Sequence, residues 1–480
     1  MKLAIDFGTS YSAAGVANDG RVELISFGES QQFRTSVFFP VLLPSVDDFY
    51  LSPEIEREIA QTVQKSKSDQ TRELKRLEEL RQAANKLPTE DRKHSLATIP
   101  DLKARSDEDL YKEAVDVARR NWLTQQTRAA LSGTASIDDA IYGEEAIDAY
   151  LQGKAGHLVS SPKSMLGFSL IGEARSILTG VTSRILLHIR RQAELQTGKR
   201  FDQLLLGRPV RFKSSQGEQG TYQAIDIIRI AAFAAGFTSV DFIEEPVAAS
   251  WHVHKNHSAS PLKTLIVDVG GGTTDLAYGL IGGESHRPAI KHAWGISKGG
   301  TDIDINLSMR SFMPAFGKNT HNIPNHIFYQ ASSVHDLVRQ KEFSNCDMTR
   351  YPQPYSGRLS RLQELGATIR LNRAVERTKI FLSEHEKAQI RLGYIERDLT
   401  ISATRAELED SSELFLNELT NVISQAISES EPIEMVYLTG GASRAPYVVT
   451  AVQRAIGNAS LVIGDASYAV ISGLAHAAAE

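Results

Sequence analysis

The same short motif occurs twice in this chain, once at the N-terminus and once beyond its midpoint. Residues 3–10 read LAIDFGTS, and residues 265–275 read LIVDVGGGTTD. Each motif is an apolar run that ends in aspartate and continues through glycine and threonine into another apolar stretch. This pattern predicts a strand, a tight turn large enough for a phosphate, and a returning strand. Two such turns, each with a carboxylate, predict two halves of the chain that close on one nucleotide–metal complex.

Length and composition narrow the class of protein. A chain of 480 residues is too long for one hydrophobic core, so we expect roughly two to four domains. The formal net charge of −5 argues against nucleic acid as a partner, because such binding needs a basic face. The single cysteine, Cys346, excludes a disulfide within the chain and fits a reducing compartment. Residues 1–8 do not resemble a signal peptide. No apolar run reaches the roughly 18–20 residues that span a bilayer. We therefore expect a cytoplasmic protein without a membrane partner.

The pattern along the chain alternates between strands and helices, which predicts an α/β fold. We expect strands at 3–6, 13–17, 22–27, 36–43, 201–207, 240–243, 390–401 and 436–438, a hairpin at 264–281, and helices at 176–197, 221–235, 247–254, 326–382, 408–428, 446–456 and 467–479.

A highly charged region interrupts this alternation. We expect one helix at 54–86, beginning at the Ser52-Pro53 cap, and a second at 107–131. Ile55, Ile59 and Val63 form an apolar stripe on the first of these helices. The region is interpreted as a solvated helical arm that packs by one face on its host domain. A docking surface for a partner is the alternative.

The second turn carries the richer chemistry. Gly270, Gly271 and Gly272 have no Cβ to keep a phosphate away, and their N–H groups can form an anion nest. Thr273 and Thr274 add hydroxyls that can meet a phosphate oxygen or a metal-bound water. Asp268 and Asp275 bracket the loop, and two carboxylates beside a phosphate require a cation. The spacing therefore predicts Mg²⁺, held largely through water.

Two further segments carry the same kind of signal. The first turn supplies Asp6, Gly8, Thr9, Ser10 and Tyr11, with fewer glycines. Residues 439–446 read TGGASRAP, which predicts a strand-to-helix loop where Gly440 and Gly441 admit a ligand and Arg444 can lie against a base or phosphate.

Together these segments resemble the nucleotide-binding domain of the DnaK-type (70-kilodalton heat-shock) chaperones, in the actin/sugar-kinase/heat-shock ATPase superfamily, and in particular its short YegD-like branch. Both phosphate motifs and the 440–446 adenosine motif match. Residues 245–249, EPVAA, echo the inter-lobe Glu-Pro motif, and residues 299–304, GGTDID, resemble a further family segment. The resemblance covers nearly the whole chain except residues 52–136.

The resemblance implies a two-lobed actin-like ATPase fold, built from duplicated ribonuclease H-like domains, with a helical insertion in the first lobe. The first lobe would comprise residues 1–258, with its core at 1–35 and 176–258 and the insertion with its subdomain at 36–175. The second would comprise residues 259–480, with its core at 259–303 and 390–480 and a helical subdomain at 304–389. Residues 259–261 are the expected hinge.

Roles are carried over from the family onto matching positions. Lys163, in the segment SPKSMLG, resembles the lysine that reaches the γ-phosphate. Glu245 resembles the glutamate that faces the metal and its waters, Asp268 the carboxylate that orients the attacking water, and Thr273 the hydroxyl near the γ-phosphate. The metal would be held, mostly through water, by Asp6, Asp268, Asp275 and Glu245.

The resemblance also assigns the nucleotide's other contacts. The helix around residues 375–383 resembles the family's adenosine-clamping helix. Ile380 stands where the family has an adenine-stacking arginine, so a cation–π contribution of about 0.5–2 kcal/mol is missing. The remaining contacts would come from Gly299, Gly300, Glu376, Lys379, Ser383, Gly440, Gly441, Ala442, Ser443, Arg444 and Asp465.

The expected function is that of an ATP-binding and slowly ATP-hydrolysing, heat-shock-like chaperone, with ATP/ADP and Mg²⁺ as cofactors. We expect no C-terminal peptide-binding domain, and the partners implied by the resemblance are unfolded polypeptide or a separate co-chaperone. Two alternatives stay open: a small-molecule kinase of the sugar-kinase type, and an actin-like filament protein, although the charged insertion makes regular stacking harder.

Overall fold

A computed structural model of the chain describes all residues except 19, 42–47, 87, 89–91, 93–95, 97–98, 101–103, 133–138, 171, 258–259, 321 and 465–467, and leaves the side chains of 127–132 and 173 aside. It divides into two compact units. The first unit comprises residues 1–38, 140–154 and 158–480, and the second comprises residues 39–139 and 155–157.

The first sheet contains the first of the duplicated motifs. β1 (Lys2–Phe7) pairs antiparallel with β2 (Tyr11–Asn18), which pairs with β3 (Arg21–Leu24) and with the short β4 (Gln32–Arg34). On its other side β1 pairs in parallel with β8 (Gln203–Arg208), and β8 pairs with β9 (Ser239–Glu244). The strand order is β3-β2-β1-β8-β9. Leu3, Ala4 and Ile5 are fully buried, as a strand covered on both faces requires.

The second sheet repeats this topology. β10 (Leu262–Val269) pairs antiparallel with β11 (Thr274–Ile281), which pairs with β12 (Ala289–Ile296). β10 also pairs in parallel with β15 (Met435–Thr439), and β15 pairs with β16 (Ser460–Ile463). The order β12-β11-β10-β15-β16 matches the first sheet strand for strand. The predicted α/β class, with duplicated sheets of the actin-like ATPase type, is therefore confirmed.

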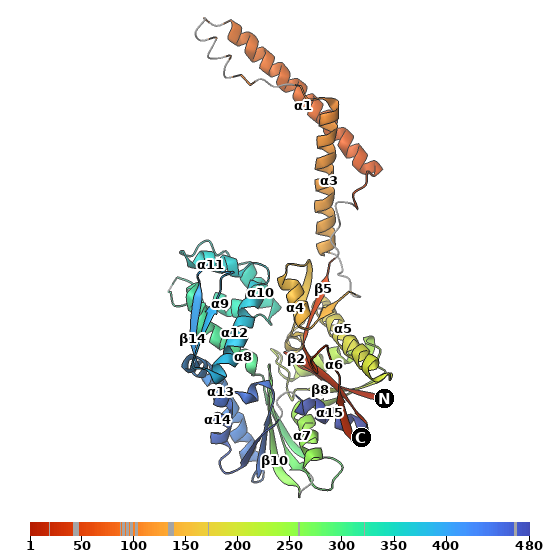
Figure 1. Cartoon of the computed structure of the whole chain (residues 1–480), viewed down its shortest axis with the longest axis vertical. Coiled ribbons are helices and arrows are strands. Elements are labelled where there is room, and N and C mark those ends of the chain that lie inside the picture. The colour runs from red at the N-terminus through yellow and green to blue at the C-terminus, as the bar shows by residue number, and fades with distance from the viewer. Residues whose placement is uncertain are drawn as a thin grey trace. The chain divides into compact units, whose positions relative to one another are not determined.

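Two helices join the sheets by crossing between them. α7 (Glu245–Asn256) follows β9 of the first sheet but packs on β10 and β11 of the second. α15 (Ala469–Ala479) comes after β16 of the second sheet but packs on β1 and β2 of the first. The helices also pack on each other, and one apolar core contains Ala248, Ile266 and Leu474 together with residues of β1, β2, β8, β11 and β15. Figure 1 shows α15 beside β8 and α7 beside β10. Because each helix leaves its own sheet, the two sheets share a core.

Several other helices of this unit cover the sheets (Figure 1). α5 (Gly172–Thr197) packs on α6 (Glu218–Ala234), and α13 (Arg405–Glu429) packs on β11, β12 and α14 (Pro446–Ala455). The remaining elements are β5 (Ser36–Pro40), β6 (Ile141–Tyr142), α4 (Glu144–Leu151), β7 (Gly156–Ser160), η2 (Pro162–Met165), α8 (Gly300–Leu307), η3 (Ser308–Phe312), η4 (Met313–Phe316), α9 (Asn325–Ser332), α10 (Leu337–Ser344), α11 (Tyr355–Leu362), α12 (Ala367–Glu384), β13 (Lys387–Arg391), β14 (Thr400–Thr404) and η5 (Gly441–Arg444).

Most predicted elements are present, and the differences have simple causes. The mainly helical stretch predicted at 326–382 consists of α9 to α12, with Pro352 and Pro354 between α10 and α11. The strands β12 and β16 were not predicted. Both are edge strands with mixed burial, so neither shows a clear apolar alternation.

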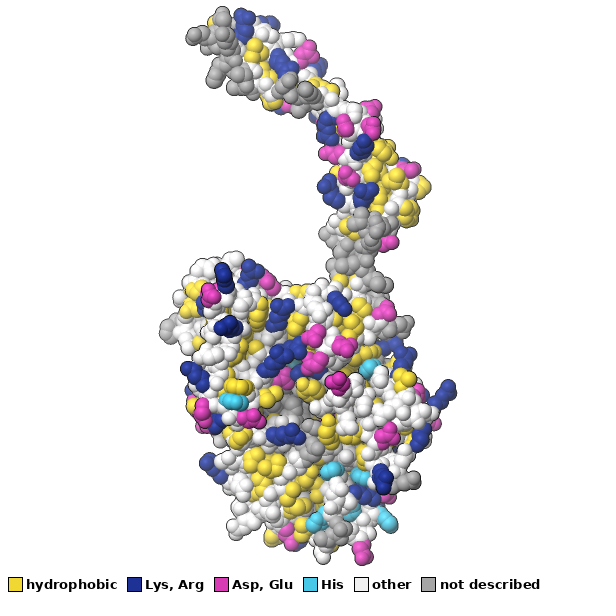
Figure 2. Space-filling model, in the orientation of Figure 1, with side chains coloured by type: hydrophobic (Ala, Val, Ile, Leu, Met, Phe, Trp, Pro, Cys, Tyr) yellow, Lys and Arg dark blue, Asp and Glu magenta, His cyan; other side chains and the backbone are white. Residues whose placement is uncertain are grey.

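The second unit contains the two predicted charged helices, α1 (Pro53–Asn85) and α3 (Asp107–Ser132). Ser52 caps α1 by accepting a hydrogen bond from the Ile55 N–H, as the Ser-Pro pair predicts. The Ile55, Ile59 and Val63 stripe packs against Ala114 and Ala118 of α3, so its apolar face is used within the arm itself. Figure 2 shows acidic and basic side chains interleaved along these helices. No helix in the described part of the chain is long and apolar enough to cross a membrane.

The close approach of α7 and α15 gives a stability prediction. A Cβ added at Gly473 would lie 1.7 Å from the Ala248 carbonyl oxygen, so Gly473→Ala must push the helices apart. We expect this variant to lose about 1–3 kcal/mol of unfolding free energy, measured by urea unfolding. Gly180→Ala on α5 is the matched control, because its Cβ meets nothing within 4 Å and alanine favours a helix. Equal stability of the two variants would contradict the crossing.

Candidate functional site

The second glycine turn connects two paired aspartates. Asp268 on β10 and Asp275 on β11 are direct partners in the antiparallel ladder, and the Gly270 N–H closes the turn by donating to the Thr273 carbonyl at 3.0 Å. The Thr274 hydroxyl is buried and donates to the Lys298 carbonyl at 2.9 Å. Thr274 therefore stabilises the turn by joining it to the segment just before Gly299. The predicted strand–turn–strand arrangement is therefore present, with both carboxylates at the same level of the sheet.

Residues 299–301 support this turn from one side. The Gly300 and Thr301 N–H groups donate to the Gly270 and Gly271 carbonyls at 3.0 and 2.8 Å. A Cβ at Gly299 would lie 2.6 Å from the Gly270 oxygen, so a larger residue would displace the turn. The sequence assigned Gly299 and Gly300 to nucleotide binding, and in the structure their backbone holds the glycine turn in place.

The two duplicated turns meet. A Cβ added at Gly271 would lie 2.6 Å from the Ser10 hydroxyl oxygen, and one added at Gly272 would lie 2.7 Å from the Thr9 hydroxyl oxygen. The first turn follows β1 and the second follows β10, so the contact joins the two sheets at equivalent points. Only residues without a Cβ allow this approach. The prediction that the duplicated turns come together is thus confirmed in the geometry.

The carboxylates predicted to hold a metal surround one buried lysine. Lys163 lies in η2, and its Nζ is 2.5 Å from Oε1 of Glu245, the first residue of α7. Ser161, just before η2, has a left-handed φ of 53°, the one such non-glycine residue in the described part of the chain. Strained backbone of this kind persists where surrounding contacts enforce it. Here the Ser161 N–H donates to the Thr35 carbonyl at 2.8 Å and so directs Lys163 inward.

The charges in this cluster are unbalanced. Burial, followed by repulsion from Glu245, raises the pKa of Asp6 to about 7 and that of Asp275 to about 8. Burial and the same glutamate raise the pKa of Asp268. Burial opposes the charge on Lys163, but attraction to Glu245 and Asp6 outweighs it and raises the lysine's pKa. Four carboxylates thus share one ammonium group, and a cation would relieve their repulsion.

The residues fit a divalent cation bound through water better than one bound directly. Among the described residues, no group of three or more His, Cys, Asp or Glu side chains is arranged to hold a metal ion by itself. Mg²⁺ commonly keeps several waters and takes few protein ligands. Asp6, Asp268, Asp275 and Glu245 could accept hydrogen bonds from such waters, while a phosphate oxygen would complete the coordination.

The predicted adenosine contacts lie next to both the second turn and Gly300. Gly440 has φ of +91°, and a Cβ there would lie 2.4 Å from the Asp268 carboxylate. Gly441 faces open space, and the buried Ser443 hydroxyl donates to the Gly440 carbonyl at 2.6 Å. A Cβ at Gly300 would come within 3.8 Å of Ala442 and 3.5 Å of Lys379 Nζ. The close approaches at Gly440 and Gly300 therefore place the adenosine motif directly beside the second turn.

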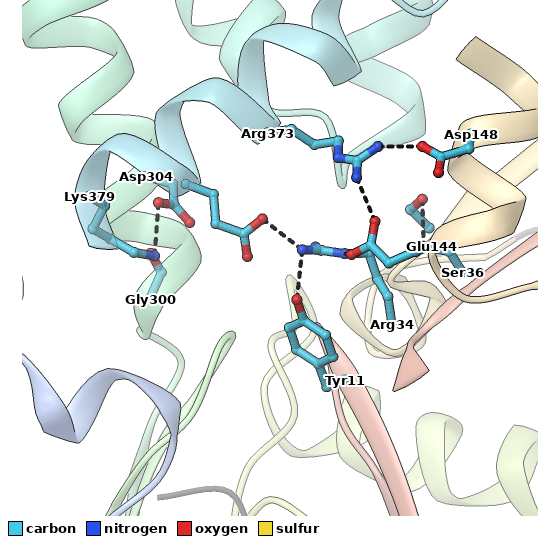
Figure 3. Close-up of polar contacts among 11 residues, drawn as sticks. Tyr11, Arg34, Ser36, Glu144, Asp148, Gly300, Asp304, Arg373 and Lys379 are labelled. Carbon is cyan, nitrogen blue, oxygen red and sulfur yellow. Dashed lines mark hydrogen bonds and ion pairs between the residues drawn. The ribbon is translucent and has the colours of Figure 1, made fainter. Parts of the chain in front are cut away.

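The side chains of α12 are engaged by protein partners (Figure 3). Lys379 Nζ contacts the buried Asp304 carboxylate at 2.8 Å and donates to the Gly300 carbonyl at 3.2 Å. The Ser383 hydroxyl donates to the Lys379 carbonyl at 3.1 Å, so this side chain is bound to its own helix.

The other predicted adenosine contacts differ from these. Ile380 is 62% exposed. Asp465 lies outside the described residues, and Arg444 has an interaction within the chain.

A network of ion pairs links α12 to the first sheet and to α4 (Figure 3). Arg34 on β4 donates to the Tyr11 hydroxyl at 2.9 Å, to Glu376 on α12 at 2.8 Å and to Glu144 on α4 at 2.7 Å. Arg373 on α12 donates to Glu144 at 2.7 Å and to Asp148 at 3.0 Å. Through Arg34 the network connects Tyr11 and Glu376, which are both predicted site residues.

Sequence reasoning did not single out Arg34, Glu144, Asp304 or Arg373. Asp304 belongs to the GGTDID segment. The sequence analysis noted that this segment resembles one of the family, but assigned no role to Asp304. The two arginines gave none, because their carboxylate partners are more than 100 residues away in sequence. The Val210 N–H, which donates to Asp275 at 2.8 Å, was equally unpredictable, since a backbone donor has no residue signature.

Comparison with known proteins gives one family-model match and several distant relatives. A family model described as Hsp70 protein matches residues 358–479. The chain is 25% identical over 309 residues to "Chaperone protein DnaK" of Cenarchaeum symbiosum, covering 62% of this chain and 39% of that protein. It is 26% identical over 278 residues to the DnaK of Thermoplasma volcanium, covering 56% and 38% of the two chains. It is 23% identical over 398 residues to "Heat shock 70 kDa protein 13" of Homo sapiens, covering 79% and 80%. The alignments thus span under two fifths of the DnaK relatives' length, but four fifths of the human protein.

The unbalanced charges predict how stability depends on pH. The folded-state pKa values of Asp6 and Asp275 lie above the ordinary value of 3.8, so the folded chain holds protons that the unfolded chain releases. The stabilisation is complete below pH 3.8 and is lost as the pH rises through about 7 and 8. We expect the unfolding free energy of protein free of metal and nucleotide to fall as the pH rises from about 4 to about 8 and to level off above that, by about 1.4 kcal/mol per unit of pKa shift.

Asp275→Asn supplies the comparison for this prediction. Asparagine keeps a carbonyl oxygen that can accept the Val210 hydrogen bond but removes the titrating group. The variant should lose less stability than the parent over the same pH range in urea unfolding at constant ionic strength. The same slope in both proteins would show that Asp275 is ionised throughout.

Proposed function

Because the chain is homologous to DnaK and other 70-kilodalton heat-shock proteins, we propose that it binds ATP with Mg²⁺ and hydrolyses it as a chaperone-like ATPase. The observation that carries this proposal is the contact between the two aspartate-bearing turns, Gly271 with Ser10 and Gly272 with Thr9. Glycine-rich turns with free N–H groups bind phosphates, and two of them can surround a phosphate chain from both sides. The carboxylates beside them supply negative charge that would hold a divalent cation through its waters.

This proposal assigns a role to each group at the site. The backbone N–H groups of residues 8–10 and 271–273 bind the phosphates, since the Gly270 N–H already donates to Thr273. Mg²⁺ would neutralise the phosphate charge when bound. Lys163 balances the charge on the transferring phosphoryl group. Asp268 accepts a hydrogen bond from the attacking water and orients it. The water oxygen bonds to the γ-phosphorus, the bond to the ADP oxygen breaks, and the water's proton is released with phosphate.

The adenosine would bind between residues 440–444 and the exposed face of α12. Ile380 is well exposed there, so it can cover one face of the base by apolar contact. Glu376 and Lys379 already have ion-pair partners, Arg34 and Asp304, and would reach a ribose only by exchanging those contacts. We therefore expect weak selectivity for adenine over other bases.

We further propose that residues 1–258 and 259–480 act as two lobes that move relative to each other with the nucleotide state. The shared core of α7 and α15 would act as the pivot, and the Arg34 and Arg373 ion pairs would open and close at the other end. Unfolded polypeptide or a separate co-chaperone would bind differently to the two lobe arrangements. A cytoplasmic location remains our expectation from the sequence.

Replacement of Lys163 tests the chemistry. Lys163→Ala should lower single-turnover ATP hydrolysis at least 100-fold, about 2.7 kcal/mol of transition-state stabilisation, while the affinity for ATP changes less than tenfold. Lys163→Arg keeps the charge beside Glu245 and serves as the matched control, with thermal unfolding to verify that each variant folds. Loss of ATP binding with unchanged turnover of bound ATP would contradict the assigned role.

A comparison of ATP turnover under three conditions tests the functional class. We expect slow turnover by the protein alone, a several-fold change on addition of an unfolded polypeptide, and no change with a panel of sugars. ADP formation that requires one sugar would instead identify a sugar-type kinase. Sedimentation of the protein in the presence of ATP but not ADP would identify a filament protein.

A further inference from the structure

A cavity of about 640 Å³ lies next to the proposed terminal-phosphate position. One end is lined by Thr9, Lys163, Gly272 and Thr273, which are the residues assigned above to that phosphate. From there the cavity extends away from the adenosine motif, between α5 on one side and α9 and α10 on the other. Its volume suits a compact organic molecule rather than a single ion or water.

The walls of this cavity are mainly apolar, and several are exposed. Ile177 on α5 is 56% exposed, and Leu337 and Val338 on α10 are 49% and 68% exposed. Tyr329 on α9 is 38% exposed, and Phe168 also lines the space. Large apolar side chains from opposite sides of the cavity therefore face a shared space without covering each other. An apolar ligand would remove them from water.

The charged groups around the cavity are already paired within the protein. Lys163 contacts Glu245 at 2.5 Å. Lys213 and Lys298 share Asp302 at 3.2 and 3.6 Å, and Glu342 accepts a hydrogen bond from Gln330 at 2.8 Å. Arg339 contacts Asp336 at 3.3 Å and also lies over the Tyr329 ring. A charged ligand would have to displace one of these partners or remain uncompensated. The cavity thus favours an uncharged ligand.

We propose that this cavity binds an uncharged amphipathic alcohol, with an apolar body of roughly ten carbons along Ile177, Phe168 and Val338 and its hydroxyl beside Thr9 and Thr273. The position of the hydroxyl rests on the proposed function, because it would lie against the terminal phosphate of bound ATP. A carboxylate at this point would repel that phosphate, and a sugar would place several hydroxyls against apolar walls. The ligand would bind together with the nucleotide and take the place of the attacking water.

Three probes distinguish these possibilities: 1-decanol, decanoate and glucose. Their binding is measured calorimetrically on the full chain, without nucleotide and with saturating Mg²⁺ and a non-hydrolysable ATP analogue. We expect decanol to bind in both states with affinities that agree within threefold. Decanoate should bind at least tenfold more weakly when the analogue is present, and glucose should not bind. Decanol should also slow phosphate release without raising the KM for ATP.

Exposed residues supply variants that leave the fold intact. The double variant Ile177→Lys, Val338→Lys places ammonium groups on both walls and should weaken decanol binding at least tenfold. The matched control is Leu195→Lys, Leu414→Lys, since these side chains are 77% and 71% exposed on α5 and α13 and do not line the cavity. This control should bind decanol like the parent.

Three outcomes would overturn the proposal, and a fourth would overturn only the part of it that rests on the proposed function. Absence of decanol binding to the nucleotide-free chain would show that the cavity has no such ligand, whatever the result for ATP. Displacement of decanol by the ATP analogue would place it in the nucleotide site, and equal loss in both double variants would show nonspecific binding. Failure of the analogue to bind, with decanol still bound and sensitive to the Ile177 and Val338 changes, would overturn the proposed ATPase function and the hydroxyl's position but not the cavity's occupant.

Discussion

The crossing of α7 and α15 is the contact on which the rest of the structure depends. Each helix belongs in sequence to one sheet and packs on the other, so neither sheet can bury its inner face without its partner. Small residues at the crossing, among them Ala248, Ala249 and Gly473, let the helices approach until there is no room for a Cβ. The two sheets are thereby held with their first strands, β1 and β10, in equivalent positions, and the turns after those strands meet.

Where the two turns meet, the structure contains more buried charged groups than folding requires. Asp6, Asp268, Asp275 and Glu245 surround the single ammonium group of Lys163, and burial makes their mutual repulsion strong. Such an arrangement lowers stability unless something positive joins it, which is typical of a binding site and not of a packing core. The left-handed Ser161 that directs Lys163 inward adds to this cost. Strain and unbalanced charge thus coincide at one place in the molecule.

The ion-pair network and the apolar cavity lie around this charged centre and differ in character. The Arg34 and Arg373 network consists of charged side chains that reach across from α12 to β4 and α4. The cavity places exposed apolar side chains of α5 and α10 opposite each other. The Glu144 and Asp148 carboxylates are 45% and 56% exposed, so water can solvate them when their ion pairs open, whereas an apolar surface gains free energy only by being covered. The first therefore suits reversible closure, and the second suits a ligand.

The sequence by itself determined the α/β alternation, the duplicated aspartate turns and the charged helices, because apolar periodicity, turn glycines and caps act over a few residues. It also located Lys163 and Glu245, though only through a family resemblance. Tertiary structure alone decided that Gly271 and Gly272 contact Ser10 and Thr9, that Arg34 joins Glu144 to Glu376, and that the edge strands β12 and β16 complete their sheet. These features depend on which distant segments share a core, and that is decided by the packing of whole helices and sheets, which no local pattern encodes.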